Sequence, residues 1–137
     1  MAVKTVLDVI DIIYQGLNGT ALDLMITGAI YKLDRPVASS LEDVIINCLP
    51  IDNNQLQTAI ANVNIYVPDI GVKVNNVAEK YPNYVRLKLL AKLGYEALSN
   101  IWIEDFDYDV QQSGIIEDDE SDAHYINIRV EFNSENF

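Results

Sequence analysis

Two stretches of the chain alternate apolar and polar residues, and this period restricts the fold more than any other feature of the sequence. In 57–67, the residues of one parity are Ala59, Ala61, Val63, Ile65 and Val67. In 125–132, they are Ile126, Ile128, Val130 and Phe132. Successive side chains of a strand point to opposite faces, so this alternation is typical of strands with one buried face. The sequence therefore predicts a sheet that is packed on one side.

Three other segments are also predicted to be strands. The segment 26–33 is followed by a proline, which cannot donate to a sheet ladder. The segment 43–49 is short, rich in β-branched residues and also bounded by a proline. The segment 101–110 alternates aromatic residues with carboxylates. Because a polar, acidic segment at about 112–123 joins this last strand to 125–132, the two are most simply an antiparallel pair with a long loop.

Apolar residues at three- and four-residue spacing predict two helices. The first covers 3–17, and Gly16 or Gly19 can end it. The second covers 84–98 and has basic residues on its polar side. The segment 71–80 before it is polar and is predicted to be irregular.

The predicted elements define one fold class. Two helices are too few to cover both faces of a parallel sheet. We therefore expect an α+β fold, with a mainly antiparallel sheet of four to five strands and both helices packed on one face. The chain of 137 residues has the size of one domain, and its hydrophobic fraction of 50% is sufficient for a core, so 1–137 is predicted to be a single domain.

The charge balance restricts the partners. The chain has 21 acidic residues against 9 basic ones and a formal net charge of -12. Nucleic-acid binding needs a local excess of Lys and Arg, so no sequence-specific nucleic-acid binding is expected. Asp8 and Asp11 interrupt the first apolar stretch, which argues against a signal peptide or a membrane span. The protein is expected in the cytoplasm, at least during assembly.

The sequence offers no convincing catalytic or metal-binding motif. Its single histidine, His124, borders the acidic loop, whereas its single cysteine, Cys48, lies in a separate apolar strand and is predicted to be a core residue. The carboxylates of 105–109 and 117–122 could hold Ca²⁺ or Mg²⁺, but they lack the spacing of an EF-hand. A solvated acidic face is favoured over a dedicated site. No catalytic residue, metal site or cofactor is therefore predicted.

Charge is distributed unevenly, with acids gathered after residue 101 and basic residues in and before the second helix. Surfaces of opposite sign can dock head to tail, although independent solubilising faces explain the same pattern. The residues that we predict at a subunit or partner interface are Asp105, Asp107, Asp109, Glu117, Asp118, Asp119, Glu120, Asp122, Arg86, Lys88 and Lys92.

The order and character of these segments resemble a known family. The segments are Gly-Leu-Asn-Gly at 16–19, Gly-Ala-Ile-Tyr-Lys-Leu-Asp-Arg-Pro at 28–36, Glu-Asp-Val-Ile-Ile-Asn at 42–47, Asn-Val-Asn-Ile-Tyr-Val-Pro-Asp at 62–69, the helix at 84–98, Ile-Glu-Asp-Phe-Asp-Tyr at 103–108 and His-Tyr-Ile-Asn-Ile-Arg-Val-Glu-Phe at 124–132. In this order they resemble the small tail-completion proteins, also called tail-terminator or head-tail joining proteins, of long-tailed bacteriophages and prophages.

The resemblance implies a structural virion component without enzymatic activity. Members of that family form homo-oligomeric rings, commonly hexamers, that cap the tail tube and join it to the neck, so the implied partners are further copies of the chain, the tail-tube protein and the neck proteins. The implied location is the tail-neck junction of the virion. An acidic channel would suit this role because like charges repel the sliding DNA. The alternative interpretation is a non-enzymatic adaptor or protein-binding module with an acidic surface able to bind a divalent cation.

Overall fold

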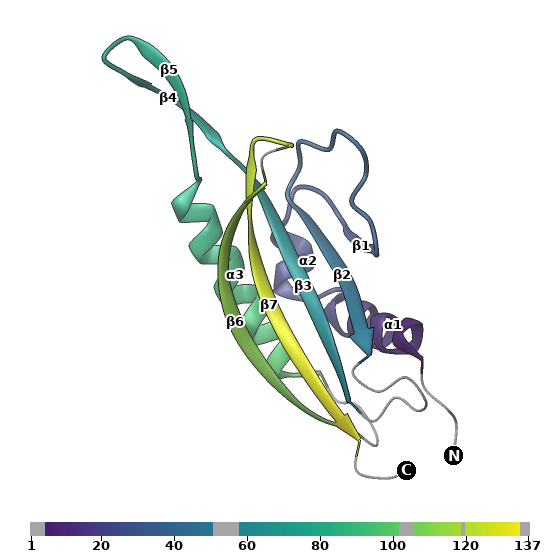
Figure 1. The fold of residues 1–137 in the computed structure, drawn as a ribbon. Coiled ribbons are helices and arrows are strands. Elements are labelled where there is room, and N and C mark those ends of the chain that lie inside the picture. Colours follow the sequence, from purple (N-terminus) through teal and green to yellow (C-terminus); the bar gives the residue numbers. More distant parts are fainter. Residues whose placement is uncertain (1–4, 51–57, 102–105, 119, 135–137) are drawn as a thin grey trace.

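The computed structural model describes residues 5–50, 58–101, 106–118 and 120–134, which form an α+β fold (Figure 1). In chain order the elements are α1 (Val6–Leu17), α2 (Ala21–Met25), β1 (Ile30–Lys32), β2 (Asp43–Pro50), β3 (Thr58–Pro68), β4 (Ile70–Val74), β5 (Val77–Tyr81), α3 (Tyr84–Ser99), β6 (Phe106–Asp118) and β7 (Ala123–Ser134). The predicted fold class is confirmed. The described residues contain one short helix and one strand pair more than the sequence predicted.

The main sheet has five strands in the order β1-β2-β3-β7-β6. Only β1 and β2 are parallel, and the other three neighbouring pairs are antiparallel, so the sheet is mixed. The predicted pairing of the two C-terminal strands is confirmed. The predicted loop at about 112–123 is wrong, because β6 resumes its pairing with β7 after a bulge at Gln112/Gly114 and continues to Asp118. Backbone pairing extends there because the acidic side chain of Glu117 stays exposed on the strand.

The alternating residues of β3 and β7 are buried on the face that α1 and α3 cover, as the sequence predicts. The side chains that meet them from the helices are Val9, Ile10, Ile13, Leu17, Leu87, Leu90 and Leu98. A Thr5–Asp8 capping box begins α1. In α3, a side chain at Gly94 would lie 2.7 Å from Ile65 Cδ1, so this glycine allows the helix to approach the sheet closely.

The opposite face of the main sheet carries a row of amides. Asn62 donates to Asn47 across β2 and β3, and Asn127 of β7 donates to both Asn62 and Asn64. These side chains are half-buried and satisfy one another. We call this surface the open face of the sheet.

The hairpin of β4 and β5 projects beyond the end of the sheet (Figure 1). The sequence prediction of an irregular segment at 71–80 is therefore wrong. Asn75 and Asn76 form a two-residue turn with φ of 52° and 63°, which is the left-handed geometry that tight hairpins require and that asparagine tolerates. Every residue of the two strands is exposed, so neither face of the hairpin is buried by the described residues. We call it the arm.

Candidate functional site

The two faces of the arm differ in chemistry. The cross-strand register places the side chains of one face as Ile70, Val72, Val74, Val77, Glu79 and Tyr81. The other face carries Lys73 and Lys80, which are the only charged residues on it. A hydrogen bond between the Tyr81 hydroxyl and the Glu79 carboxylate raises the pKa of Tyr81. The arm therefore has one apolar face with a single carboxylate and one basic face.

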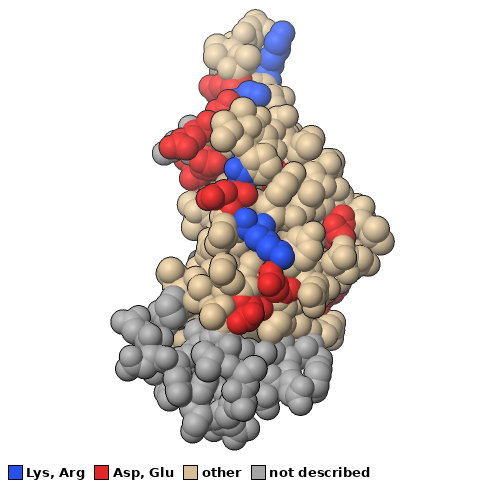
Figure 2. All heavy atoms as spheres, turned by 90° about the vertical axis from the view of Figure 1, so that its right-hand side faces the viewer, with Lys and Arg blue, Asp and Glu red and all other residues tan. Residues whose placement is uncertain are grey.

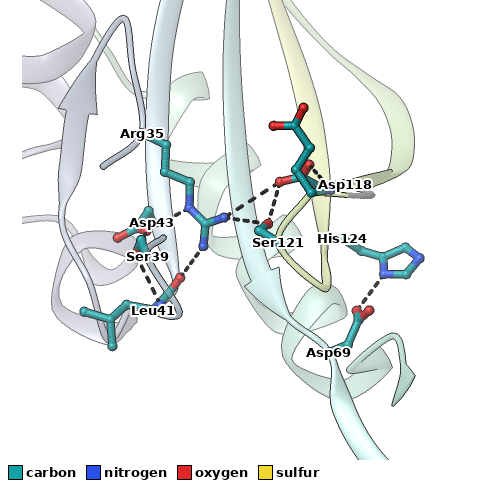
Figure 3. A network of polar contacts seen from close by, with 9 residues as sticks. Arg35, Ser39, Leu41, Asp43, Asp69, Asp118, Ser121 and His124 are labelled. Carbon is teal, nitrogen blue, oxygen red and sulfur yellow. Dashed lines mark hydrogen bonds and ion pairs between the residues drawn. The ribbon is translucent and has the colours of Figure 1, made fainter. Parts of the chain in front are cut away.

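The root of the arm is fixed to the start of β7. The backbone N–H of Asp69 donates to the carbonyl of Asp122 at 2.9 Å. The carboxylate of Asp69 lies 2.7 Å from Nδ1 of His124, and both side chains are largely buried (Figure 3). Two contacts of one residue thus connect the root of the arm to the segment that begins β7.

An open groove of about 590 Å³ lies between α3 and the outer strand β6. Its apolar walls include Tyr84 and Tyr95 of α3 and Ile115 of β6, which are 67%, 42% and 55% exposed. Lys88 and Lys92 also line it. Large apolar side chains that remain this exposed in one groove are typical of a surface that another protein covers.

The outer strand beside this groove is unpaired on one side. Within the described residues, β6 pairs with β7 alone, which leaves its other backbone edge without a strand. On the open face, Asp109 of β6 lies directly opposite Glu131 of β7. Like charges in this position destabilise a strand pair unless a cation lies near them. Arg129 is diagonal to Asp109 in the same register and is exposed.

The short turn between β6 and β7 is held by Arg35, which comes from the connection between β1 and β2 (Figure 3). The Arg35 guanidinium lies 2.9 Å from Asp43 and donates to the carbonyl of Leu41 and the hydroxyl of Ser121. It also lies 3.9 Å from Asp118. Arg35 thus positions the acidic turn through its own contacts.

Two tyrosines lie beneath this cation on the open face. The guanidinium of Arg35 lies 4.5 Å from the ring centre of Tyr66, which packs on Tyr125 at 4.7 Å. Burial raises the pKa of Tyr66, and the neighbouring Tyr125 and Asp118 add to this shift while Arg35 opposes it. The Tyr66 phenol therefore remains neutral and serves as a platform for the cation.

Asp43 is the buried anchor of this cluster. Its side chain is fully buried; one oxygen accepts from Arg35 and Ser39, while the other has no hydrogen-bond partner among the described residues. A side chain at Gly28 would lie 2.0 Å from that second oxygen and 2.5 Å from the carbonyl of Glu42. Position 28 therefore requires glycine, because the start of β2 approaches its backbone closely.

Arg86 is held in place by contacts within its own chain. Its guanidinium lies 2.6 Å and 2.8 Å from the two oxygens of the buried Glu42 carboxylate and donates to the carbonyl of Met25. The hydrogen bond with Glu42 raises the pKa of Arg86. These contacts join α3 to the end of α2 and to the residue before β2, so Arg86 is occupied within the chain.

The remaining predicted interface residues lie along β6, its turn and α3. Lys88 and Lys92 are exposed in the groove, and Asp109, Glu117, Glu120 and Asp122 are exposed while Asp118 is half-buried. The structure places the basic residues of α3 beside β6. Asp105, Asp119 and the side chain of Asp107 lie outside the described residues.

Sequence reasoning missed the arm and the aromatic walls of the groove. The alternation of Val72 and Val74 with Lys73, followed by Asn75 and Asn76, is the signal that could have identified a hairpin. No comparable signal exists for Tyr84 and Tyr95, because their place beside β6 depends on how α3 packs.

The described residues give no support for the enzymatic interpretation with Cys48 and His124. Cys48 pairs with Ala61, and His124 pairs with Val67, six residues further along β3, which places the two side chains roughly 20 Å apart. Within the described residues, no group of three or more His, Cys, Asp or Glu side chains is arranged to hold a metal ion. No helix in the described part of the chain is long and apolar enough to cross a membrane.

In comparisons with known proteins, no family model matches the chain and no curated protein matches it significantly.

Proposed function

We propose that this chain is a structural, ring-forming subunit of the tail-completion type, which caps a phage tail tube and joins it to the neck. The observation that carries the proposal is the extent of uncovered surface on this small chain that is suited to contact with other subunits. The arm, the groove beside α3 and the free edge of β6 are all left uncovered by the described residues. A chain of this size normally buries such surfaces against another subunit.

The charge of the chain supports the same role. A channel that passes DNA must not bind phosphate tightly, and a net charge of -12 disfavours such binding. Figure 2, viewed from the β1 side of Figure 1, shows basic side chains at the arm and a group of acidic side chains just below it. Oppositely charged surfaces on one chain favour contacts between different parts of identical subunits.

The mass of the purified protein in solution tests this proposal. We expect native mass spectrometry and light scattering to give a mass several times that of the 15.4 kDa chain. Negative-stain electron microscopy should show rings or stacked rings. Mixing with the tail-tube protein of the same phage or prophage should place these rings at tube ends. A protein that stays monomeric at high concentration, both alone and with the tail-tube protein, would contradict the proposal.

A further inference from the structure

The arm has an apolar face that the described residues of its own chain do not cover. Ile70, Val74 and Val77 are 44%, 41% and 57% exposed, and the two strands pair with each other beyond the end of the sheet. An isolated two-stranded hairpin is marginally stable in water. The arm therefore needs a second surface on which this face can pack.

The groove between α3 and β6 has the dimensions of the arm. A strand of five residues such as β4 is about 17 Å long. The part of α3 from Tyr84 to Tyr95, which forms the wall of the groove, rises by about 16 Å. A hairpin placed along the free edge of β6 would extend the main sheet over this flank of α3.

The charges match on both sides of such an extended sheet. If the apolar face of the arm lies on α3, its one carboxylate, Glu79, faces a groove whose charged residues are Lys88, Lys92 and Glu96, so two cations stand there against one carboxylate. The basic face of the arm then lies on the open side of the sheet, where Lys73 and Lys80 join the side of β6 that carries Asp109 and Asp118. The reverse orientation would place Lys73 and Lys80 against a groove in which lysines outnumber carboxylates, so charge favours the first orientation.

We infer that the arm of one subunit docks in the groove between α3 and β6 of a second copy of the same chain. This inference rests on the proposed ring and names the contact that builds it. The arm and the groove are different surfaces, so each subunit gives its arm to one neighbour and receives the arm of another. A contact of this head-to-tail type generates a closed ring when the rotation between neighbours closes.

Thiol cross-linking between two variants, each with one introduced cysteine, tests the contact directly. Val72→Cys places a thiol on the apolar face of the arm, and Ile115→Cys places one in the groove. Burial raises the pKa of the natural Cys48 to about 11, so its thiol should remain unreactive at neutral pH. We expect a short bifunctional maleimide to give a covalent dimer when the two variants are mixed.

Matched controls test whether the cross-link is specific to the arm and the groove. Val37 is a valine that is 99% exposed and lies outside both surfaces, so Val37→Cys mixed with Ile115→Cys should give no dimer. Val72→Cys alone should also give none, because a dimer there would indicate an arm-to-arm contact and would overturn the inference. Failure of the mixed pair to cross-link would overturn it as well.

Assembly of charged variants separates this contact from the ring itself. Val72→Asp and Ile115→Asp should each reduce the protein to a monomer, whereas Val37→Asp should assemble as the parent chain does. A mixture of the two defective variants retains one intact arm and one intact groove, so it should form a one-to-one dimer and nothing larger. Circular dichroism checks that each variant is folded.

The outcomes distinguish the two proposals. If the parent chain forms rings and Val72→Asp forms them equally well, the arm docks elsewhere and this inference is wrong while the ring remains. If the parent chain is monomeric but the mixed cysteine variants still cross-link, the ring is wrong and the arm-groove contact remains. A cross-link formed only inside one chain of a double-cysteine variant would place the arm on its own groove and overturn the inference.

Discussion

Arg35 joins its own connection and the neighbouring start of β2 to the turn before β7, where Ser121 is 86 residues further along the chain. Because its partner Asp43 is fully buried, removing the cation would leave a carboxylate without a counter-charge in the interior. We expect Arg35→Ala to lower the free energy of unfolding by about 3–5 kcal/mol, the usual cost of breaking a buried pair from one side. Urea denaturation followed by circular dichroism measures this change.

An exposed ion pair of the same chain provides the control. Lys32 lies 2.7 Å from Asp11, and both side chains are about half-exposed. Lys32→Ala should therefore cost less than about 1 kcal/mol. Equal effects of the two substitutions would show that the Arg35 contact does not stabilise the fold.

Cys48 gives the stability a dependence on alkaline pH. Burial raises the pKa of its thiol from 9.0 to about 11, so the folded state keeps the proton over a range in which the unfolded state loses it. The contribution of the neutral thiol is complete below pH 9.0 and is lost as the pH rises toward about 11. Over this range the parent chain should lose roughly 2 kcal/mol more stability than Cys48→Ala does. Urea midpoints of both proteins at pH 8 to 11, in reducing buffer, test this expectation, and parallel curves would contradict it.

At the scale of elements, both long helices and the strands of the main sheet were predictable, whereas α2 and the arm were not. The strands β3 and β7 and the helices α1 and α3 follow from periodicity, because each buries one face. The helix α2 has five residues, too few to show a period, and the arm buries neither face, so its polarity resembled that of a loop. The extension of β6 was missed because its pairing with β7 outweighs the charge of its last residues.

The independence of the arm leads to a prediction about this element. Ile70 and Tyr81 are paired at its base, so a short Gly-Ser link can replace 70–81 without moving Asp69 or Pro82. We expect the shortened chain to melt within about 4 °C of monomeric Val72→Asp, which corresponds to roughly 1 kcal/mol in a domain of this size. Thermal unfolding by circular dichroism measures both proteins. A much larger decrease would show that the arm stabilises the body of its own chain.

For the whole molecule, the sequence predicted which segments are acidic and which are basic better than where these segments lie relative to one another. The excess of acids along β6 and the basic residues of α3 are visible in the composition of those segments. Their proximity could not be predicted, because α3 precedes β6 in the chain without pairing with it, and only the packed structure places the two side by side. The contact of Arg86 within the chain could not be predicted for the same reason, since Glu42 reaches it only through tertiary packing.

The attachment of the arm at Asp69 has a geometric consequence for an assembly of the kind we propose. Around a circle of identical units, the same step angle recurs at every joint, and the steps must add up to one full revolution. In the proposed ring the arm makes the contact between neighbours, so the contacts of Asp69 with Asp122 and His124 would fix the angle of each step. A small change in the tilt of the arm at Asp69 would be repeated at every contact between neighbours, and the circumference of the ring would change with it.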